Sequence, residues 1–450
     1  MSQYLRDAEL EVPVETPRQL VDYFVRGGRP PEDWRVGTEY EKICVRRDGR
    51  AVPFFGPAGV EELLVRLSRS HGWEPVVENA HVVALRRGRA SITLEPGAQL
   101  ELSGEPWRTV REAARELRGH VREIVEVGEP LGIFFLGLGM QPFSPIDEIP
   151  WVPKERYRIM APYMTKVGSL GHRMMKQTAS IQVNVDYEDE ADAMAKMRVA
   201  TAICPLLTAM FANSPFCDGK LGEYLSYRSH VWTDTDPQRS GFLPFVFSDT
   251  ASFDDYVRYA LDVPMYFIVR ERWIDMTAYT FRQYLERGYE GHRATLADWH
   301  AHLTTLFPEV RLKRYVEVRC FDCQMPELAL AAPAICKGVL YSRGSLEAAW
   351  ELVKAWTWEE RLELWHEVHR SAMRAKVRGL TVRDLCGELL EAARLGLVDR
   401  GAQEEVVYLE PLFDLVRKGV SPAEEVRRRW SSEWAEDPEQ LVRALAYRPF

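Results

Sequence analysis

The sequence is poor in several features that mark particular classes of protein. Its 450 residues include only seven cysteines, an odd number spread from Cys44 to Cys386. This argues against a disulfide framework and for reduced thiols, so the cytoplasm is the expected compartment. The formal net charge of −9 leaves the chain without the basic surface of a general nucleic-acid binder, and we expect no nucleic-acid partner.

Long hydrophobic runs are also missing. The longest, Leu131 to Met140, is too short to span a bilayer and is typical of a buried strand. Met1 to Leu10 mixes charges and has no apolar core, which argues against a secretory signal. The sequence shows no low-complexity tract, repeat, Walker A motif or kinase signature. We expect no membrane partner, and any ATP must be held by another kind of fold.

The composition is otherwise that of a folded protein with a large core, because 46% of residues are hydrophobic and 28% are charged. Residues 1–33 read as a helical preamble that ends in glycines and prolines. Residues 34–330 alternate predicted strands with helices and form the predicted catalytic region. Residues 331–450 are predicted to be helical and to pack on that region. Monomer and homodimer remain open.

The most informative stretch is a predicted strand, Arg35 to Ile43, which contains two glutamates two residues apart. In an extended strand Glu39 and Glu41 share one face, while Tyr40 points the other way. Neighbouring carboxylates repel each other, so a cleft that holds both needs a shared proton or a hard cation such as Mg²⁺. On its own such a pair is more often solvated surface.

Further polar residues recur on the other predicted strands, about six in all. Between Leu94 and Leu102, Glu95 and Glu101 differ by an even number, although Pro96 and Gly97 can interrupt the strand. Two later strands have polar faces, formed by Gln182 and Asn184 in one and by Lys313, Tyr315, Glu317 and Arg319 in the other. Several acids together with an arginine fit phosphoryl transfer, in which metal ions neutralise developing charge.

Two arginines and a cysteine pair complete the candidates. Arg228 and Arg239 lie in a turn-rich stretch and suit the recognition of carboxylate or phosphate, although most arginines form surface pairs. Cys320 and Cys323 are spaced as in some zinc sites, but a structural zinc needs about four ligands and no others follow at regular spacing. The sequence therefore does not predict a zinc site.

At this point the sequence resembles a known family, the plant-type glutamate–cysteine ligases, within the glutamine-synthetase-like ligases. The similarity is collinear over residues 35–325 and weaker to about 425. It is carried by Gly37-Thr-Glu-Tyr-Glu-Lys42, Ile92-Thr-Leu-Glu-Pro-Gly97, Glu101-Leu-Ser-Gly104, Lys166-Val-Gly-Ser-Leu-Gly171, Gln182-Val-Asn184, Phe211-Ala-Asn-Ser-Pro-Phe216, Tyr227-Arg-Ser-His-Val-Trp-Thr-Asp-Thr-Asp236, Leu243-Pro-Phe-Val-Phe247, Ala260-Leu-Asp-Val-Pro-Met-Tyr-Phe267 and Leu306-Phe-Pro-Glu-Val-Arg-Leu-Lys-Arg-Tyr315.

The resemblance implies an α+β fold with an antiparallel, funnel-like sheet. It also implies that ATP, L-glutamate and L-cysteine give γ-glutamylcysteine through a γ-glutamyl phosphate, the first step of glutathione biosynthesis. The implied Mg²⁺ ligands are Glu39, Glu41, Glu95, Glu101, Glu317 and, less firmly placed, Gln182. Glu41, Glu317 and Arg319 are the implied catalytic residues, with Lys313 and Arg319 on ATP. Asn184, Arg228, Trp232 and Arg239 are the implied substrate contacts.

The chain departs from the family pattern in two places. Relatives commonly have histidine at the position of Tyr40, which faces away from the glutamate pair. Residues 320–324 read Cys-Phe-Asp-Cys-Gln where relatives are glycine-rich, so a different amine acceptor stays an alternative. A non-catalytic relative is a second alternative, but it predicts lost metal ligands. Met276 stands where a plant redox cysteine belongs, and we expect no such switch.

Overall fold

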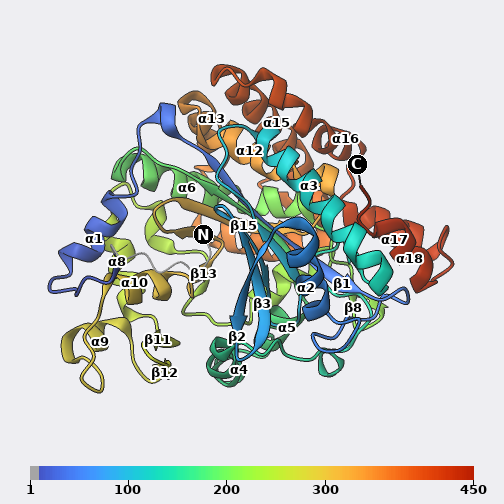
Figure 1. Cartoon of the computed structure of the whole chain (residues 1–450). Coiled ribbons are helices and arrows are strands. Elements are labelled where there is room, and N and C mark those ends of the chain that lie inside the picture. Colours follow the sequence, from blue (N-terminus) through green and yellow to red (C-terminus); the bar gives the residue numbers. More distant parts are fainter. Residues whose placement is uncertain (1–9, 450) are drawn as a thin grey trace.

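The fold is built around one large antiparallel sheet (Figure 1). The structure is a computed structural model that describes residues 10–449, so the first nine residues of the predicted preamble lie outside it. The rest of the preamble forms α1 (Arg18–Val25) and a short 3-10 turn, Pro31–Asp33. The chain then enters β1 (Val36–Val45), which lies in the middle of the sheet.

The sheet has nine strands among the described residues, in the order β14-β15-β7-β1-β5-β4-β3-β2, with β6 also paired to β1. The other strands are β2 (Glu74–Glu78), β3 (His81–Arg87), β4 (Ala90–Leu94), β5 (Leu100–Ser103), β6 (Phe134–Leu136), β7 (Ser180–Val185), β14 (Val310–Leu312) and β15 (Val316–Asp322). The predicted α+β class and antiparallel sheet are confirmed. The estimate of about six strands was low, because β2 is short and because the hairpins β4–β5 and β14–β15 each lie in a stretch that reads as one strand.

Register brings the predicted polar residues onto one face of the sheet. Glu39 is the partner of Gln182 on β7, and Glu41 is the partner of Glu101 on β5. On the far side of β7, Asn184 is paired with Glu317 of β15. Strands that are distant in sequence therefore place their side chains side by side, which is the condition for a shared site.

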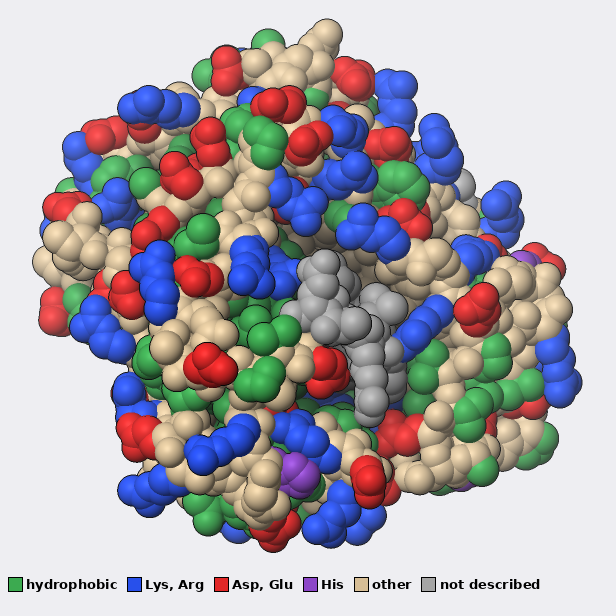
Figure 2. Space-filling view, turned by 60° about the vertical axis from the view of Figure 1, so that its left-hand side comes forward, with side chains coloured by type: hydrophobic (Ala, Val, Ile, Leu, Met, Phe, Trp, Pro, Cys, Tyr) green, Lys and Arg blue, Asp and Glu red, His purple; other side chains and the backbone are tan. Residues whose placement is uncertain are grey.

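Helices cover the sheet and fill the core. Helices α2 (Val60–His71) and α3 (Val110–Gly128) pack on β3 and β1, and α6 (Glu190–Phe211) packs on β15. By length and composition α6 is apolar enough to cross a membrane, but 89% of that window is buried inside the protein, as in a core helix. Figure 2 shows acidic and basic side chains interspersed over one face of the molecule.

Two predicted strands differ in extent from those observed. Helix α3, which lies between them, begins at Val110, because Thr109 and Glu112 form a capping box there. The apolar stretch 131–140 contributes only β6 to the sheet. The stretch 94–102 is a hairpin rather than one strand, since a turn separates β4 from β5.

The C-terminal region is helical, as predicted, and shares the core of the sheet. Helix α12 (Ala331–Leu340) packs on β7 and on α15 (Val382–Asp399). The remaining helices are α4 (Glu155–Val167), α5 (Gly171–Gln177), α7 (Tyr227–Trp232), α8 (Phe253–Asp262), α9 (Phe281–Arg287), α10 (Leu296–Leu303), α11 (Pro326–Ala329), α13 (Arg343–Val353), α14 (Trp358–Ser371), α16 (Glu410–Lys418), α17 (Pro422–Ser431) and α18 (Pro438–Leu445). The described residues also form four short strand pairs. These are β8 (Phe216–Cys217) with β9 (Lys220–Leu221), β10 (Ser240–Gly241) with β13 (Phe307–Pro308), β11 (Phe267–Val269) with β12 (Trp273–Asp275), and β16 (Lys376–Val377) with β17 (Leu380–Thr381).

Candidate active site

A cleft lies on the polar face of the sheet and is walled by helices α4, α5 and α7. Its lining includes most of the predicted site residues and divides into an acidic half and a basic half. The predicted residues that line it are Glu39, Glu41, Glu95, Glu101, Gln182, Arg228, Trp232, Lys313 and Arg319.

The acidic half is formed by three carboxylates. Glu41, Glu95 and Glu101 each offer an oxygen, and these oxygens lie within 4.8 Å of one another. Burial raises the pKa of Glu41 to about 7, with a further contribution from Glu95. Burial also raises the pKa of Glu101 to about 8, and the charges of Glu39, Glu95 and Glu41 add to it. The cluster is therefore short of positive charge.

A tight turn holds Glu95 in this cluster. The backbone N–H of Glu95 donates to Gln99 O at 3.0 Å, and that of Ala98 donates to Glu95 O at 2.9 Å. A Cβ on Gly97 would lie 2.2 Å from Lys176 O, so only glycine fits there. The proline-rich stretch 141–154 supports the turn from outside, since Val152 N–H donates to Pro96 O at 2.9 Å.

Polar neighbours hold the carboxylates of both glutamates on β1 in place. Glu41 accepts hydrogen bonds from Ser180 N–H at 2.6 Å and from Gln182 Nε2 at 3.0 Å. Glu39 accepts one from Asn184 Nδ2 at 3.3 Å. As predicted, Tyr40 is buried on the opposite face of the strand. Gln182 also accepts a hydrogen bond from Arg319, so it joins the two halves of the cleft.

The basic half surrounds Glu317, which is fully buried. Arg311 donates to both of its oxygens, at 3.0 Å and 2.6 Å, and Arg319 donates to one at 2.6 Å. Lys313 Nζ lies 3.0 Å from the other oxygen. Burial alone would raise the pKa of Glu317, but these three cations hold it well below its usual range. Three cations around one carboxylate leave net positive charge.

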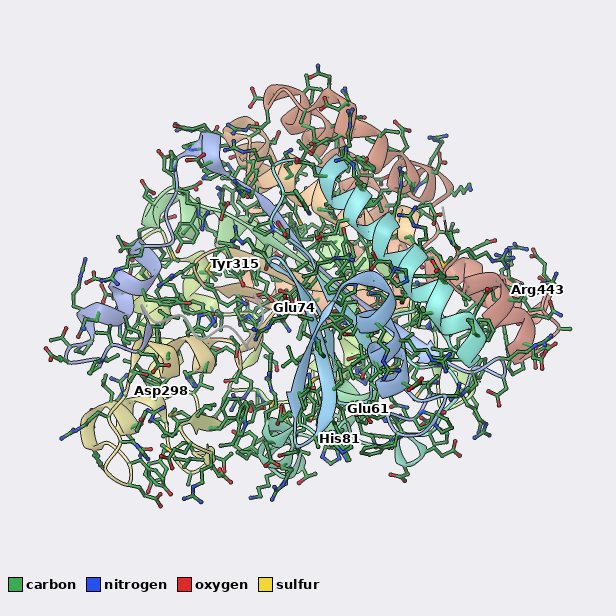
Figure 3. The ribbon with its side chains drawn as sticks, in the orientation of Figure 1. Glu61, Glu74, His81, Asp298, Tyr315 and Arg443 are labelled. Atoms are coloured by element: carbon green, nitrogen blue, oxygen red, sulfur yellow. The ribbon has the colours of Figure 1, made fainter. Side chains whose placement is uncertain are left out.

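This arrangement corrects the predicted strand 312–319. Lys313 and Tyr315 lie in a turn between β14 and β15, closed by Lys313 N–H donating to Tyr315 O at 2.8 Å. Tyr315 is labelled in Figure 3. Arg311, on β14, is the register partner of Glu317 and was missed. The sequence did contain a signal for it, because Arg311 alternates with the apolar residues Val310 and Leu312. A hairpin between β14 and β15 places Arg311 opposite Glu317.

Of the four predicted substrate contacts, Arg228 and Trp232 line the cleft, whereas Asn184 and Arg239 are not among its lining residues. Arg228 lines the cleft, donates to Arg319 O at 2.8 Å, and has Nη1 3.9 Å from Asp322. Trp232 lines it too, next to Phe307. Arg239 is fully buried and is not among the lining residues. Its guanidinium is engaged by Asp236 at 2.6 Å and by two backbone carbonyls.

Sequence reasoning also missed Arg156 on α4. It lines the cleft and, among the described residues, forms no ion pair with a carboxylate. Its guanidinium lies 5.7 Å from the ring centroids of Tyr157 and Phe267. Nothing in its local sequence distinguishes it from a surface arginine, because only the tertiary fold brings α4 to the sheet.

Comparison with known proteins then decides the family. The profile described as Glutamate-cysteine ligase family 2 (GCS2) matches residues 35–444. The chain belongs to this family. It is 42% identical to glutamate–cysteine ligase B, chloroplastic, of Oryza sativa subsp. japonica, covering 96% of this chain and 87% of that protein. It is 41% identical to the chloroplastic glutamate–cysteine ligase of Medicago truncatula, covering 98% of this chain and 87% of that protein.

Solved structures share the fold of this family member at low sequence identity. A glutamate–cysteine ligase from Francisella tularensis in complex with AMP matches with a TM-score of 0.55 and 14% identity, over 92% of this chain and 88% of that one. A bifunctional glutathione synthetase from Pasteurella multocida matches with a TM-score of 0.54 and 14% identity, over 95% of this chain and 53% of that one.

Proposed function

We propose that the protein ligates the γ-carboxylate of L-glutamate to the amine of L-cysteine at the expense of ATP, which is the first step of glutathione biosynthesis. The observation that carries this proposal is the divided cleft, with three converging carboxylates at one end and three converging cations at the other. Family membership supports the same reaction. The seven free cysteines favour a reducing compartment such as the cytoplasm.

The acidic half fits magnesium. Mg²⁺ takes oxygen ligands and is commonly held by a few carboxylates together with phosphate oxygens. Glu41, Glu95 and Glu101 would hold it, with Glu39 beside them. Burial and the neighbouring carboxylates raise the pKa values of Glu41 and Glu101, and a bound cation would offset this repulsion. A bound Mg²⁺ supplies charge neutralisation for the phosphates of ATP.

The basic half suits the transferring phosphoryl group. Arg311, Lys313 and Arg319 are fixed by Glu317, so their donors are oriented before substrate binds. Glu317 was predicted to bind Mg²⁺, but we assign it the role of orienting these cations. Both of its oxygens already accept hydrogen bonds from cationic side chains. Arg228 and Arg156 line the cleft beyond this cluster and suit the α-carboxylate of glutamate.

The reaction then has two steps. A γ-carboxylate oxygen of glutamate attacks the terminal phosphorus of ATP, and the bond to the ADP oxygen breaks. The cysteine amine attacks the acyl carbon, the bond between that carbon and the phosphate oxygen breaks, and the amine loses a proton. The products are γ-glutamylcysteine, ADP and phosphate. The chain contributes position and charge to both steps.

Cysteine is the acceptor that family membership supports. The alternative acceptor was suggested by residues 320–324, yet none of them lines the cleft. All five are buried behind it, and Asp322 accepts hydrogen bonds from Ser214 and Ser226. The unusual sequence at residues 320–324 therefore changes the packing behind the cleft, at the end of β15, and does not change the cleft lining.

Omission of single substrates tests the proposal. Purified protein with ATP, Mg²⁺, glutamate and cysteine should release phosphate and form γ-glutamylcysteine in equal amounts, measured by a phosphate assay and mass spectrometry. Phosphate release that continues without glutamate or cysteine would overturn it. Parallel reactions with other amino acids as acceptors should be much slower than that with cysteine.

A further inference from the structure

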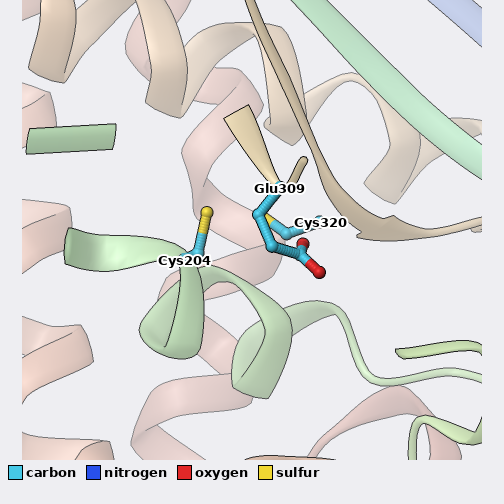
Figure 4. A group of neighbouring side chains, drawn as sticks. All are labelled: Cys204, Glu309 and Cys320. Carbon is cyan, nitrogen blue, oxygen red and sulfur yellow. The ribbon is translucent and has the colours of Figure 1, made fainter. Parts of the chain in front are cut away.

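Two cysteines and a glutamate meet behind the catalytic strand, outside the cleft (Figure 4). Cys204 comes from α6, Cys320 from β15, and Glu309 from the segment directly before β14. Their sulfur and carboxylate atoms lie within 4.8 Å of one another, and all three side chains are buried. Among the described residues, the only other such group is Glu41, Glu95 and Glu101.

The donor set suits a borderline or soft metal ion rather than magnesium. Zn²⁺ binds cysteine sulfur at about 2.3 Å, so two sulfurs in a tetrahedral site are about 3.8 Å apart. The observed limit of 4.8 Å lies within about 1 Å of that separation, which small side-chain rotations can close. The two oxygens of Glu309 can complete a set of four donors with the two sulfurs.

The buried position of these side chains disfavours uncompensated negative charge on them. Burial raises the pKa of the Cys204 thiol well above its usual range, with Cys320 adding to it. Burial likewise raises the pKa of Glu309, which Arg228, Arg319 and a contact with Trp365 partly oppose. A metal ion binds cysteine as the thiolate and glutamate as the carboxylate, so its binding would displace protons from this group.

We propose that Cys204, Cys320 and Glu309 form a binding site for one thiophilic divalent ion such as Zn²⁺, separate from the magnesium site. Such an ion would hold two residues that contact the backbone of Arg319. The backbone N–H of Arg319 donates to Glu309 O at 3.0 Å, and Cys320 follows it directly. Occupancy is therefore expected to stiffen the support of a cleft arginine. The proposal does not depend on the identity of the ligase substrates.

The sequence did not reveal this site, because its spacing singled out Cys320 and Cys323 as a pair. Cys323 lies apart from the group, with its sulfur 3.7 Å from Tyr447 OH and 3.8 Å from Leu136 O. The actual partners of Cys320 are 116 and 11 residues away in the chain, by the residue numbers of Cys204 and Glu309. Only the packing of α6 on β15 brings them together.

Cobalt spectroscopy tests the site in the full-length protein. The protein is stripped with chelator under reducing conditions and titrated with Co²⁺ in excess Mg²⁺, which occupies the carboxylate cleft. We expect one equivalent of Co²⁺ to bind with a thiolate-to-cobalt charge-transfer absorption, and Zn²⁺ to abolish that absorption. Cys204→Ala and Cys320→Ala should each weaken binding by about tenfold or more and reduce the absorption.

A matched control uses another buried cysteine. Cys386→Ala removes a buried thiol outside the group and should leave the cobalt spectrum unchanged. Circular dichroism verifies that each variant is folded, and Glu309→Gln should weaken binding while the sulfur-derived absorption persists. The proposal is overturned if the folded wild-type protein shows no charge-transfer absorption, or if Cys204→Ala and Cys320→Ala keep it unchanged.

Discussion

Single side chains show how this cleft separates its charges. Glu41 and Glu101 are register partners on the neighbouring strands β1 and β5 and have raised pKa values, while Glu317 is surrounded by cations and has a lowered pKa. The same residue type thus has opposite electrostatic character at the two ends of one site. Each end can be tested by a substitution that preserves shape.

Removing one carboxylate of the acidic group should abolish turnover. Glu41→Gln keeps the side-chain shape and one hydrogen-bonding oxygen but removes the charge that would bind Mg²⁺. We expect γ-glutamyl phosphate formation to fall by at least about 10²-fold in a phosphate-release assay, with an unchanged circular dichroism spectrum. Glu347→Gln, on the exposed surface, is the control. Near-normal turnover of Glu41→Gln would refute the assignment.

Removing a cation at the other end should impair chemistry and spare metal binding. Arg311→Gln breaks the two-pronged contact with Glu317 and removes one positive charge from the basic half. We expect kcat to fall by about 10²-fold or more, while the Mg²⁺ concentration needed for half-maximal rate changes little. Steady-state kinetics measures both. A large change in the Mg²⁺ requirement alone would contradict the division of the cleft.

The acidic group should also make stability depend on pH. The pKa of Glu101 is raised from 4.5 to about 8, so between these pH values the folded protein binds more protons than the unfolded chain. Its contribution to stability therefore decreases as pH rises from about 4.5 to about 8. In EDTA, Glu101→Gln should melt higher than wild type at pH 8 and show little difference at pH 4.5. Equal melting at pH 8 would contradict the raised pKa.

At the scale of elements, the sheet was more predictable than its connections. The period-two alternation placed Glu39 and Glu41 on one face correctly because β1 is regular over ten residues. Arg311 and the hairpin at Lys313 were missed because a tight turn reversed the chain within a stretch that still alternated. Arg156 was missed because α4 reaches the cleft only through tertiary packing, which no local pattern encodes.

The turn between β4 and β5 offers a test at this scale. Gly97→Ala places a Cβ 2.2 Å from Lys176 O, which must displace the turn that carries Glu95. We expect a higher Mg²⁺ requirement and a lower melting temperature. Gly119→Ala, in α3, has no heavy atom within 4 Å of the new Cβ and should be neutral or stabilising by up to about 1 kcal/mol. Equal behaviour of the two variants would argue against the close approach of Gly97 to Lys176.

At the scale of the whole molecule, the C-terminal helices are joined to the sheet by a shared core and a buried ion pair. Lys337 on α12 lies 2.8 Å from Glu405, and Lys337 also donates to Arg108 O at 3.1 Å. Glu405 in turn accepts from Val110 N–H, at the start of α3, at 3.2 Å. The predicted boundary near residue 331 therefore lies within one continuous structure.

Breaking that ion pair should destabilise the whole chain at once. Lys337→Met leaves a buried carboxylate without its partner, which typically costs about 3–5 kcal/mol. We expect a single unfolding transition, monitored by fluorescence, with its midpoint at a lower denaturant concentration than in the wild type. Lys337→Met combined with Glu405→Leu should recover part of the loss. Separate transitions for the sheet and the C-terminal helices would show that the two regions are independent.

The central claim is that this cleft activates the γ-carboxylate of glutamate as an acyl phosphate, and isotope transfer tests it most directly. Glutamate labelled with oxygen-18 in its γ-carboxylate is supplied with ATP, Mg²⁺ and cysteine, and the released phosphate is analysed by mass spectrometry. The account predicts that each phosphate carries one oxygen atom from glutamate. Unlabelled phosphate formed together with γ-glutamylcysteine would contradict it.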